Sequence, residues 1–530
     1  MNQSFDFIIV GAGAAGCLLA NRLSENPTHK VLLLEAGGKD WNPLIRVPMV
    51  AGLLYFLPSV NWGYQTGPQA HLNGRYIKWP RGKVLGGSTS INGMMYMRGQ
   101  HQDYDDWGQA GLKGWSYDDV LPFFKKFERN VSHQEDRQFH GRDGELHTEK
   151  AKAEHPLYDA WLACAAQSGH KSNEDFNGAD QEGVGPYDFN IKDGKRVSAA
   201  DAFLNPIRRR PNLNIVTRAQ VLNLNFDGKV CTGLTCRVGG KSKTYAASRE
   251  VILSAGAVNS PQILQLSGIG DAQSLQSMGI DVVQDRPQVG KNLQDHIGVY
   301  LQHKCRQPIT LFGLMRPDRA IFAGLRATMF GTGPAAAVPL EVGGFLKTRP
   351  DLDRPDVHVT FVPGLSLATT QAGQLEHGFL TNVYQLRPKS RGAISLASPD
   401  PMSKPVIHPH YLSNAEDIVC LRDGVRLIRT IAHQSPLDPY RGDEISPGID
   451  ATSDDDLDNW IRGSVDTIFH PVGTCRMGAD ESSVLDDQLR VRGIDRLRVI
   501  DASAMPSITS GNTSMPTMMI AEKGAAMIVR

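Results

Sequence analysis

Residues 5–16 read FDFIIVGAGAAG, and residues 31–38 read VLLLEAGG. The first run is an apolar strand that feeds a GxGxxG pattern, and a predicted helix then leads to a second buried strand that ends at Glu35. The glycines allow a tight turn and the approach of a pyrophosphate to the helix N-terminus, and the acid accepts hydrogen bonds from a ribose. The order of these features predicts dinucleotide binding. Glu35 argues against the 2′-phosphate of NADP, while NAD and FAD stay open.

Three separated blocks of the chain have this glycine-rich, strand-like character. The first contains WPRGKVLGGSTSINGMMYMRG (79–99), whose glycines let a backbone lie flat against a large planar ligand. The second contains VILSAGAVNSPQILQLSGIG (251–270), a buried strand followed by a helix with Pro261 near its start. The third runs from residue 465 to 530. We predict one nucleotide-binding domain assembled from all three, because the middle block is too short for a core of its own.

More polar stretches with alternating patterns lie between these blocks. VHVTFVP (357–363) and FLTNVYQL (379–386) predict an antiparallel sheet with one exposed face. The predicted fold is therefore mixed α/β, a Rossmann-like domain with an inserted antiparallel-sheet substrate domain. The expected boundaries are 1–155, 206–300 and 465–530 for the nucleotide-binding domain, and 156–205 and 301–464 for the substrate domain.

Composition excludes several classes of protein. The 530 residues include 56 basic and 56 acidic side chains, so the charge balance does not favour a nucleic-acid partner. Seven scattered cysteines, none in a CxxC pattern, argue against a disulfide framework. A strand that begins at Phe5 leaves no room for a signal peptide, and no apolar run reaches 18 residues. We expect a cytoplasmic protein; its oligomeric state stays open.

Residues 47–60, VPMVAGLLYFLPSV, are almost wholly apolar but too short to span a bilayer. We interpret them as a lid packed over a cofactor. The alternative is a patch that dips into a membrane interface, which would place the protein peripherally at the inner membrane.

The third block also contains the best candidates for catalysis. His470 has no neighbouring acid and no second His or Cys at ligand spacing, so we expect no metal site. Asn512 precedes an apolar helical run with Pro516 in its first turn. The positive end of that helix suits an anionic oxygen or a reduced flavin. The alternatives are a structural histidine and an asparagine that, with Ser514, caps the helix.

The longer motifs together resemble one known family. Four long motifs, in order, resemble the glucose–methanol–choline (GMC) oxidoreductase family, and within it bacterial choline, sorbose and aliphatic-alcohol dehydrogenases. The match runs from Phe5 to about Ala526. The motifs are residues 79–99, SAGAVNSPQILQLSGIG (254–270), FHPVGTCRMG (469–478) and GNTSMPTMMIAEK (511–523), supported by VGKNLQDH (289–296) and LRPKSRG (386–392). Residues 60–83 are similar to membrane-associated medium-chain alcohol dehydrogenases.

The resemblance implies FAD and assigns residues to it. The ADP half is expected to contact Gly11, Gly13, Ala14, Ala15, Glu35 and Ala36, with Val221 on the adenine side and Ala255 closing the site. The flavin is expected to contact Arg81, Val84, Gly86, Gly87, Asn92, Gly93, Met94 and Met95, and from the last block Asp501, Ala502, Asn512 and Thr513. By the same resemblance His470 is the active-site base and Asn512 its partner.

Two departures from the family pattern bear on cofactor attachment and substrate. Ile91 stands where some choline-oxidising members carry a histidine bound covalently to flavin, so we expect noncovalent FAD. Thr360 stands where the choline enzymes have an additional histidine, although Glu341 matches their acid for a quaternary ammonium. The resemblance thus implies a neutral primary alcohol, contacted by Glu341, Thr360 and Phe469.

The implied reaction is hydride transfer from the alcohol carbon to flavin N5, with His470 as base and an aldehyde as product. We expect electrons to pass to a quinone or another carrier and not to oxygen. The alternatives are an alcohol oxidase, a choline-type dehydrogenase, a hydroxynitrile lyase on the same fold and a non-catalytic flavin-binding subunit.

Overall fold

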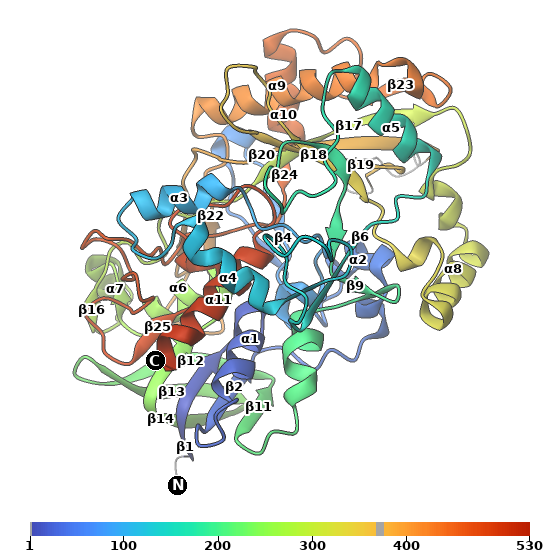
Figure 1. The fold of residues 1–530 in the computed structure, drawn as a ribbon. Helices are drawn as coiled ribbons and strands as arrows, with labels where there is room; N and C mark the ends of the chain where they lie inside the picture. Colours follow the sequence, from blue (N-terminus) through green and yellow to red (C-terminus); the bar gives the residue numbers. More distant parts are fainter. Residues whose placement is uncertain (1–2, 367–375, 530) are drawn as a thin grey trace.

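The computed structural model describes residues 3–366 and 376–529, and the chain folds around two large sheets (Figure 1). The first sheet lies near the N-terminus. Its strands are β1 (Gln3–Val10), β2 (Val31–Glu35), β11 (Leu213–Thr217), β12 (Ala219–Asp227), β13 (Val230–Val238), β14 (Lys241–Leu253) and β25 (Leu497–Val499).

Strands from all three glycine-rich blocks pair in this sheet. Strand β1 pairs in parallel with β2 and with β14, and β25 pairs in parallel with the end of β14. Strands β12, β13 and β14 form an antiparallel extension of the parallel core. The strands of the core are buried on both faces, as a parallel sheet covered by helices requires. The predicted mixed α/β, Rossmann-like architecture is confirmed.

Two helices that begin beside this sheet position the cofactor loops. Helix α1 (Ala14–Leu23) follows β1 directly and packs against α11 (Ser514–Val529), which is buried along most of its length. Pro516 lies in the first turn of α11, as predicted. Pro261, in contrast, lies in the second turn of α6 (Gly256–Leu266), so its predicted place was wrong. The carbonyl of Ala257, which a proline cannot satisfy, accepts a hydrogen bond from Thr474 Oγ1 at 2.7 Å.

The second sheet is antiparallel, as predicted for its central strands. Its members are β7 (Gly183–Pro186), β17 (Ile297–Cys305), β18 (Val342–Leu346), β19 (Val357–Val362), β20 (Gly378–Gln385), β23 (Arg441–Ser446) and β24 (Asp466–Thr467). Strand β17 crosses the expected boundary at residue 300, and the domain boundaries otherwise stay a prediction.

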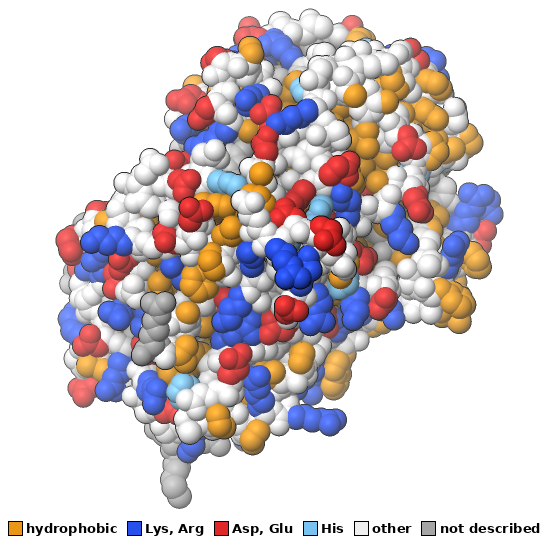
Figure 2. Space-filling view, viewed as in Figure 1, with side chains coloured by type: hydrophobic (Ala, Val, Ile, Leu, Met, Phe, Trp, Pro, Cys, Tyr) orange, Lys and Arg blue, Asp and Glu red, His pale blue; other side chains and the backbone are white. Residues whose placement is uncertain are grey.

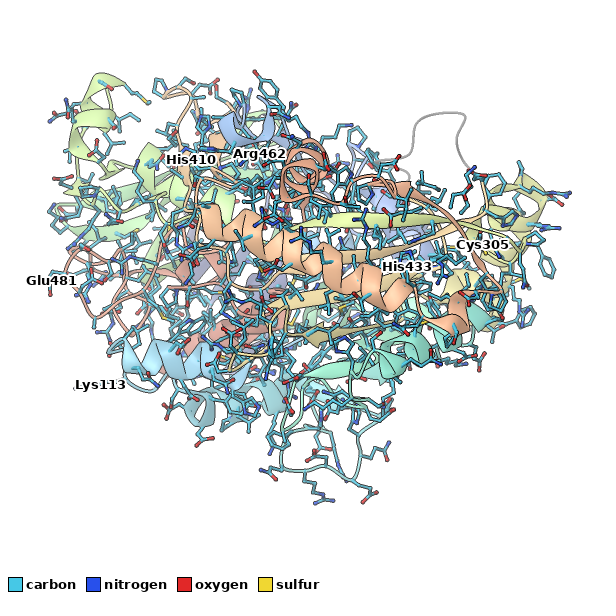
Figure 3. All side chains as sticks on the ribbon, turned by 90° about the horizontal axis from the view of Figure 1, so that it is seen from above. Lys113, Cys305, His410, His433, Arg462 and Glu481 are labelled. Atoms are coloured by element: carbon cyan, nitrogen blue, oxygen red, sulfur yellow. The ribbon has the colours of Figure 1, made fainter. Side chains whose placement is uncertain are left out.

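The prediction that this sheet exposes one face was wrong. One face packs against α9 (Ala415–Ala432) and α5 (Pro156–Gln167); in Figure 3, α9 lies across the strands and ends at His433. The opposite face is also buried, because it lines an internal cavity. On β19 the alternation is clear: Val357 and Val359 face the core, and His358 and Thr360 face the cavity. The polar face therefore meets the cavity instead of solvent.

Smaller elements complete the fold. The remaining helices are α2 (Ala51–Leu54), α3 (His101–Gln109), α4 (Tyr117–Phe127), α7 (Ala272–Ser277), α8 (Pro317–Phe330) and α10 (Asp454–Ser464). The remaining strands are β3 (Tyr64–Gln65), β4 (Lys78–Trp79), β5 (Glu128–Asn130), β6 (Leu146–Lys150), β8 (Asp188–Phe189), β9 (Ile191–Lys192), β10 (Lys195–Arg196), β15 (Ile269–Gly270), β16 (Gln284–Asp285), β21 (Ala393–Ser395) and β22 (Val406–His408).

All seven cysteines are unpaired, and six of them are buried. In the described parts of the chain, no helix combines the length and apolarity needed to cross a bilayer.

Candidate active site

A cavity of about 600 Å³ lies between the two sheets. It is of the size that holds a cofactor-sized ligand. Most of the predicted site residues meet on its wall: Gly11, Gly13, Ala14, Ala15, Glu35, Ala36, Arg81, Gly87, Asn92, Gly93, Met94, Met95, Val221, Ala255, Thr360, Phe469, His470, Asp501, Ala502, Asn512 and Thr513.

Three predicted site residues are not on this wall. Val84 is buried behind it in a cluster with Ile91, and the Gly86 amide donates to the Ala12 carbonyl at 2.8 Å. The Glu341 carboxylate accepts a hydrogen bond from the backbone nitrogen of Ala153 at 3.4 Å, and Glu341 is not among the residues that line the cavity. The structure therefore does not place Glu341 on the cavity wall, and its predicted substrate contact stays a prediction.

The two glycine-rich loops touch each other at one end of the cavity. Gly11 has φ +98°, and a Cβ there would lie 2.5 Å from the Ser254 carbonyl oxygen. Gly87 has φ +54°, and a Cβ there would lie 2.7 Å from the Cα of Gly13. Only glycine combines this backbone geometry with so close an approach. The backbones of both loops are thus exposed to whatever occupies the cavity.

Glu35 fixes the first of these loops. Its carboxylate accepts the Ala12 amide at 2.9 Å and the Gly37 amide at 2.8 Å. Burial raises the pKa of Glu35 to about 7, although both amides oppose that shift. The carboxylate retains free lone pairs toward the cavity for a ribose hydroxyl.

At the other end, the N-terminus of α11 faces the cavity with unsatisfied polar atoms. Asn512 Oδ1 and Ser514 Oγ are buried, line the cavity and have no hydrogen-bond partner in the described chain. Neither Asn512 nor Ser514 therefore serves only as a helix cap. Buried polar groups of this kind require a ligand or water, and a helix N-terminus favours an anionic one. Together with the glycine loops, these atoms fit the polar edges of FAD.

His470 lies in the wall between this end and the second sheet, and its two ring nitrogens have different partners. His470 Nδ1 lies 3.0 Å from His296 Nδ1, and His470 Nε2 lies 3.0 Å from Asn512 Nδ2. Burial, and then the neighbouring His296 and Arg81, hold the pKa of His470 well below its ordinary value. The imidazole is therefore neutral at neutral pH.

The hydrogen-bond chain determines which nitrogen carries the proton. His296 Nε2 lies 2.9 Å from the carbonyl of Leu386, which can only accept, so this nitrogen carries hydrogen. Burial lowers the pKa of His296 to about 4, so its Nδ1 is a bare acceptor. His470 Nδ1 must then donate to it, which leaves His470 Nε2 unprotonated, with its lone pair accepting from Asn512 Nδ2 at 3.0 Å.

The backbone around His470 is held firmly. Its amide donates to Asp295 Oδ1 at 2.7 Å, and the preceding residue, Phe469, has a strained φ of +68°. The Phe469 carbonyl accepts a hydrogen bond from Arg81 Nη2 at 2.7 Å. Burial raises the pKa of Asp295 to about 6, although Thr467 and Tyr411 both donate to its carboxylate. Strain of this kind at a cavity wall is typical of a functional site.

His358 is a histidine on the cavity wall that the sequence did not indicate. Its Nε2 lies 2.7 Å from Tyr187 Oη, which itself donates to the Val359 carbonyl, so this nitrogen is the donor. Its Nδ1 then accepts from Tyr384. His358 shares the cavity-facing side of β19 with Thr360, so this wall does carry a histidine, two residues before the position where the family pattern led us to expect one. Both of its nitrogens are occupied, however, so it has none left for a substrate.

His296 was also missed, although it lies within the quoted motif NLQDH. Only the tertiary contact with His470 reveals its part in the site. Residues 47–60, the predicted lid, line the cavity through Gly52 and Tyr55, and the Tyr55 ring lies 5.0 Å from that of Phe469.

Comparisons with known proteins agree with this geometry. Family models described as GMC oxidoreductase match residues 5–298 and 388–521. The oxygen-dependent choline dehydrogenase of Brucella suis is 42% identical over 526 residues, covering 99% of this chain and 95% of the relative. The mitochondrial choline dehydrogenase of Mus musculus is also 42% identical, over 99% of this chain and 89% of its own length.

Solved structures show the same relationship. A pyridoxine 4-oxidase from Mesorbium loti superposes with a TM-score of 0.90 at 33% identity, covering 98% of each chain. Formate oxidase of Aspergillus oryzae has a TM-score of 0.93 at 27% identity, covering 99% of this chain and 98% of its own. The chain is therefore a member of the GMC oxidoreductase family and an FAD-dependent oxidoreductase that acts on CH–OH donors.

Proposed function

We propose that the protein oxidises a neutral primary alcohol to an aldehyde, with His470 Nε2 as the base. The observation that carries this proposal is the chain of hydrogen bonds from Leu386 through His296, which leaves His470 Nε2 unprotonated on the cavity wall, where a substrate hydroxyl would take the place of the Asn512 amide as its hydrogen-bond donor. An alkanol is too weak an acid to ionise alone at neutral pH. A well-placed base contributes about 10²–10⁴-fold to such a reaction.

Bound FAD supplies the acceptor for the hydrogen and electron pair that leave the alcohol carbon. In our proposal His470 Nε2 takes the hydroxyl proton, and the His296 Nδ1 acceptor stabilises the imidazolium that forms. Asn512, whose amide lies 3.0 Å from that nitrogen, orients the substrate oxygen. The N-terminus of α11 stabilises negative charge in the adjoining part of the cavity.

The chemistry of the substrate half supports a neutral substrate. Its wall is formed by aromatic, apolar and neutral polar side chains, with no carboxylate among the described residues there. Among the described residues that line the cavity, the acids are Glu35 and Asp501, and both belong to the cofactor half. Glu341, the expected anchor for a quaternary ammonium, faces Ala153 instead.

Choline is the second candidate. Relatives at 42% identity are named choline dehydrogenases, and Tyr55, Tyr300 and Phe469 offer aromatic faces on the cavity wall. Aromatic faces attract quaternary ammonium groups without a carboxylate. The two candidates therefore differ in whether the aromatic wall binds a cation or an alkyl chain.

An anaerobic reduction assay tests the reaction and the substrate together. We expect 1-alkanols to bleach the flavin absorbance faster than choline at equal concentration. Faster bleaching by choline would select the second candidate. No bleaching by any alcohol, with cleavage of a cyanohydrin instead, would favour the hydroxynitrile lyase alternative.

The acceptor calls for a separate assay. We propose a carrier other than oxygen. The related proteins include an oxygen-dependent choline dehydrogenase and a pyridoxine 4-oxidase, and these favour oxygen instead. Mixing the alcohol-reduced enzyme with air-saturated buffer and then with a soluble quinone compares the two directly. If oxygen reoxidised the reduced flavin as fast as the enzyme turns over, the proposal of a carrier other than oxygen would be wrong.

We also propose that FAD is noncovalent. Ile91, on the cavity wall, offers no nucleophilic atom for a bond to the flavin. Acid precipitation is expected to release yellow FAD into the supernatant, and colour retained in the pellet would overturn the proposal.

Peripheral membrane contact gains support from a second apolar element beside the lid. Helix α8 exposes Ile321, Phe322, Leu325, Met329 and Phe330, and hydrophobic side chains gather over it at the right edge of Figure 2. Its inner face packs against lid residues Val47 and Met49. Arginines on the same helix suit anionic lipid headgroups. We expect the protein to sediment with anionic vesicles and Phe322→Glu to abolish this; no sedimentation of the parent protein would exclude the contact.

A further inference from the structure

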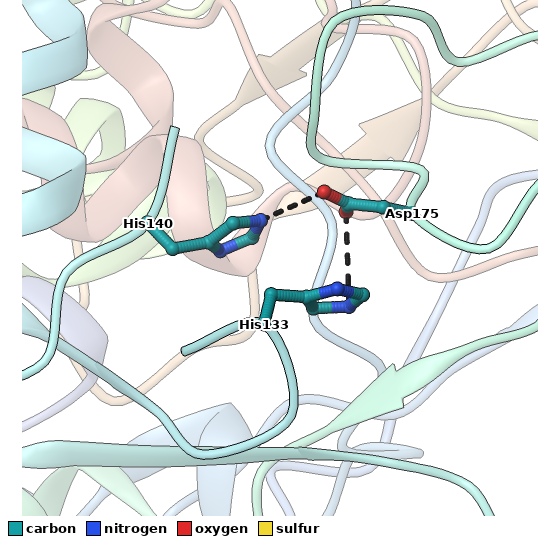
Figure 4. Close-up of side chains that lie close together, drawn as sticks. All are labelled: His133, His140 and Asp175. Atoms are coloured by element: carbon teal, nitrogen blue, oxygen red, sulfur yellow. Dashed lines mark hydrogen bonds and ion pairs between the residues drawn. The ribbon is translucent and has the colours of Figure 1, made fainter. Parts of the chain in front are cut away.

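We propose that His133, His140, Asp175 and Asp188 form a zinc site outside the cavity. The first three lie together in Figure 4, on the loops that follow β5 and precede β7, and Asp188 begins β8. We expected no metal from the sequence, because that argument considered only the surroundings of His470. The ligands are far apart along the chain and only the fold unites them.

The distances suit a small divalent cation. His140 Nε2 lies 2.8 Å from Asp175 Oδ2, and His133 Nε2 lies 4.0 Å from Asp175 Oδ1. The ligand atoms of these three residues all lie within 4.8 Å of one another. Bonds of about 2.0–2.2 Å to a tetrahedral zinc separate its ligands by roughly 3.4 Å. Small side-chain rotations would therefore close the site around the ion.

Two buried atoms at the site lack partners, which points to a ligand. His133 Nε2 and Asp188 Oδ1 are shielded from solvent and make no hydrogen bond within the described chain. His133 Nε2 lies 3.3 Å from Asp188 Oδ2, but without hydrogen-bonding geometry. Leaving such atoms unsatisfied is costly, and a cation coordinated by both removes that cost.

The charge balance also favours a divalent ion. In the described chain, the ion pairs of Asp175 and Asp188 are with histidines alone. The third nearby carboxylate, Glu128, is neutralised by Arg98 at 2.7 Å. Apart from the two histidines, which give up their protons when they coordinate a metal, no cationic side chain pairs with Asp175 or Asp188 in the described chain, and a divalent cation would take that place.

Glu128 has a second role that is common around bound zinc. Its Oε1 lies 3.1 Å from His140 Nδ1, so it orients the ring and leaves Nε2 directed at Asp175. Carboxylates commonly hold the second nitrogen of a metal-bound histidine in this way. Two imidazoles and two carboxylates form a donor set that zinc accepts.

The position of the site indicates a structural role for the ion. The backbone of Asp188 accepts the Tyr96 amide at 2.8 Å, and Phe189 bridges to Met95, which lines the cavity. A bound zinc would join the two loops to this strand, behind the flavin-facing segment. We therefore expect it to increase thermal stability and FAD retention, with no part in the chemistry.

The test uses the FAD-loaded enzyme after chelation and dialysis. Calorimetric titration with zinc is expected to show about one site per chain, and the unfolding midpoint is expected to rise with zinc concentration. Cobalt substitution is expected to give visible absorption bands typical of tetrahedral coordination. His133→Ala and Asp175→Asn should each lose these signals while keeping native circular dichroism.

His147→Ala is the matched control, because His147 pairs with Glu149 at 3.1 Å outside the cluster. It should bind zinc like the parent protein. Absence of stoichiometric binding by the parent protein would overturn the proposal, as would undiminished binding by Asp175→Asn. His133 lies on a loop and is partly exposed, so its substitution leaves a folded variant for the comparison if Asp175→Asn is unstable.

Discussion

The two halves of the cavity differ in what forms their walls: backbone atoms in one half and side chains in the other. The cofactor half is formed by backbone, from loops such as those around Gly11 and Gly87 and the first turn of α11. The substrate half is formed by side chains on alternate positions of β19 and β20, including Thr360 and Tyr384. A wall of backbone atoms requires particular residues, such as glycines, in a fixed local order. A wall of side chains requires only that alternate residues of the strands point to the same side of the sheet.

This difference explains where the two halves tolerate change. A substitution in the cofactor half alters how two loops fit together, so we expect an all-or-none loss of the cofactor. A substitution in the substrate half alters one contact among several, so we expect graded effects on rate or binding. The experiments below test that distinction.

Gly87→Ala should have the largest effect. The new methyl group would lie 2.7 Å from the Cα of Gly13, at a residue with φ +54°. Both the contact and the strained backbone push the two loops apart. We expect purified protein without FAD, measured by the ratio of absorbance at 450 and 280 nm.

Gly38→Ala is the matched control, because nothing lies within 4 Å of a Cβ there and its φ is ordinary. It should retain FAD. Full FAD content in Gly87→Ala would show that the loops separate easily and would remove the distinction between the two halves.

His470→Ala should reduce the rate of anaerobic flavin reduction by at least ~10²-fold, because it removes the proposed base. FAD content should not change, since the cavity wall stays intact. Stopped-flow absorbance measures the rate. A rate close to that of the parent protein would make His470 structural and place the base elsewhere.

Substitution of His296 should reduce the rate of flavin reduction by a smaller factor, because His296 determines the tautomer of His470. His296→Leu removes the acceptor for His470 Nδ1, so the proton is free to move to Nε2 and block the lone pair. We expect about a tenfold loss in reduction rate, the equivalent of a hydrogen bond of about 1.4 kcal/mol. His296→Gln can still accept from His470 and donate to Leu386, so it should restore most of the rate; equal losses would indicate a packing role.

The pH profile tests the same pair. Burial lowers the pKa of His470, so the base is already unprotonated at neutral pH and stays so as pH rises. We expect kcat/KM to be flat from about pH 7 to 9 and to fall about tenfold per unit only below the ordinary histidine value of about 6.5. A fall in kcat/KM with a midpoint above pH 7 on the acidic side would contradict the inference that His470 is neutral at neutral pH.

The sequence predicted the cofactor half far better than the substrate half, for the same physical reason. Glycine spacing, Glu35 and the small residues before α11 are local signals, and most of the residues they indicated, though not Val84 or Gly86, line one cavity. The tautomer of His470 depends on His296, which reaches it only through tertiary contact. Likewise His358 is recognisable only once β19 is known to turn its polar face inward. Glu341 is not on the cavity wall, because a motif match does not determine where a side chain points.

The smallest expected effect concerns the alkyl chain of the substrate. Apolar side chains such as Leu340, Leu380 and Ile468 line the substrate half, and Tyr55 of the lid closes it. Each methylene buried there is worth about 0.8 kcal/mol, so KM should fall about fourfold per carbon along a series of 1-alkanols until the cavity is filled. Leu380→Ala enlarges the cavity and leaves His470 unchanged. In this variant KM should continue to fall up to a longer alcohol than in the parent protein. A KM that ignores chain length in both proteins would show that the alkyl group lies outside the cavity, and the aromatic wall would then be better explained as a binding site for a cation.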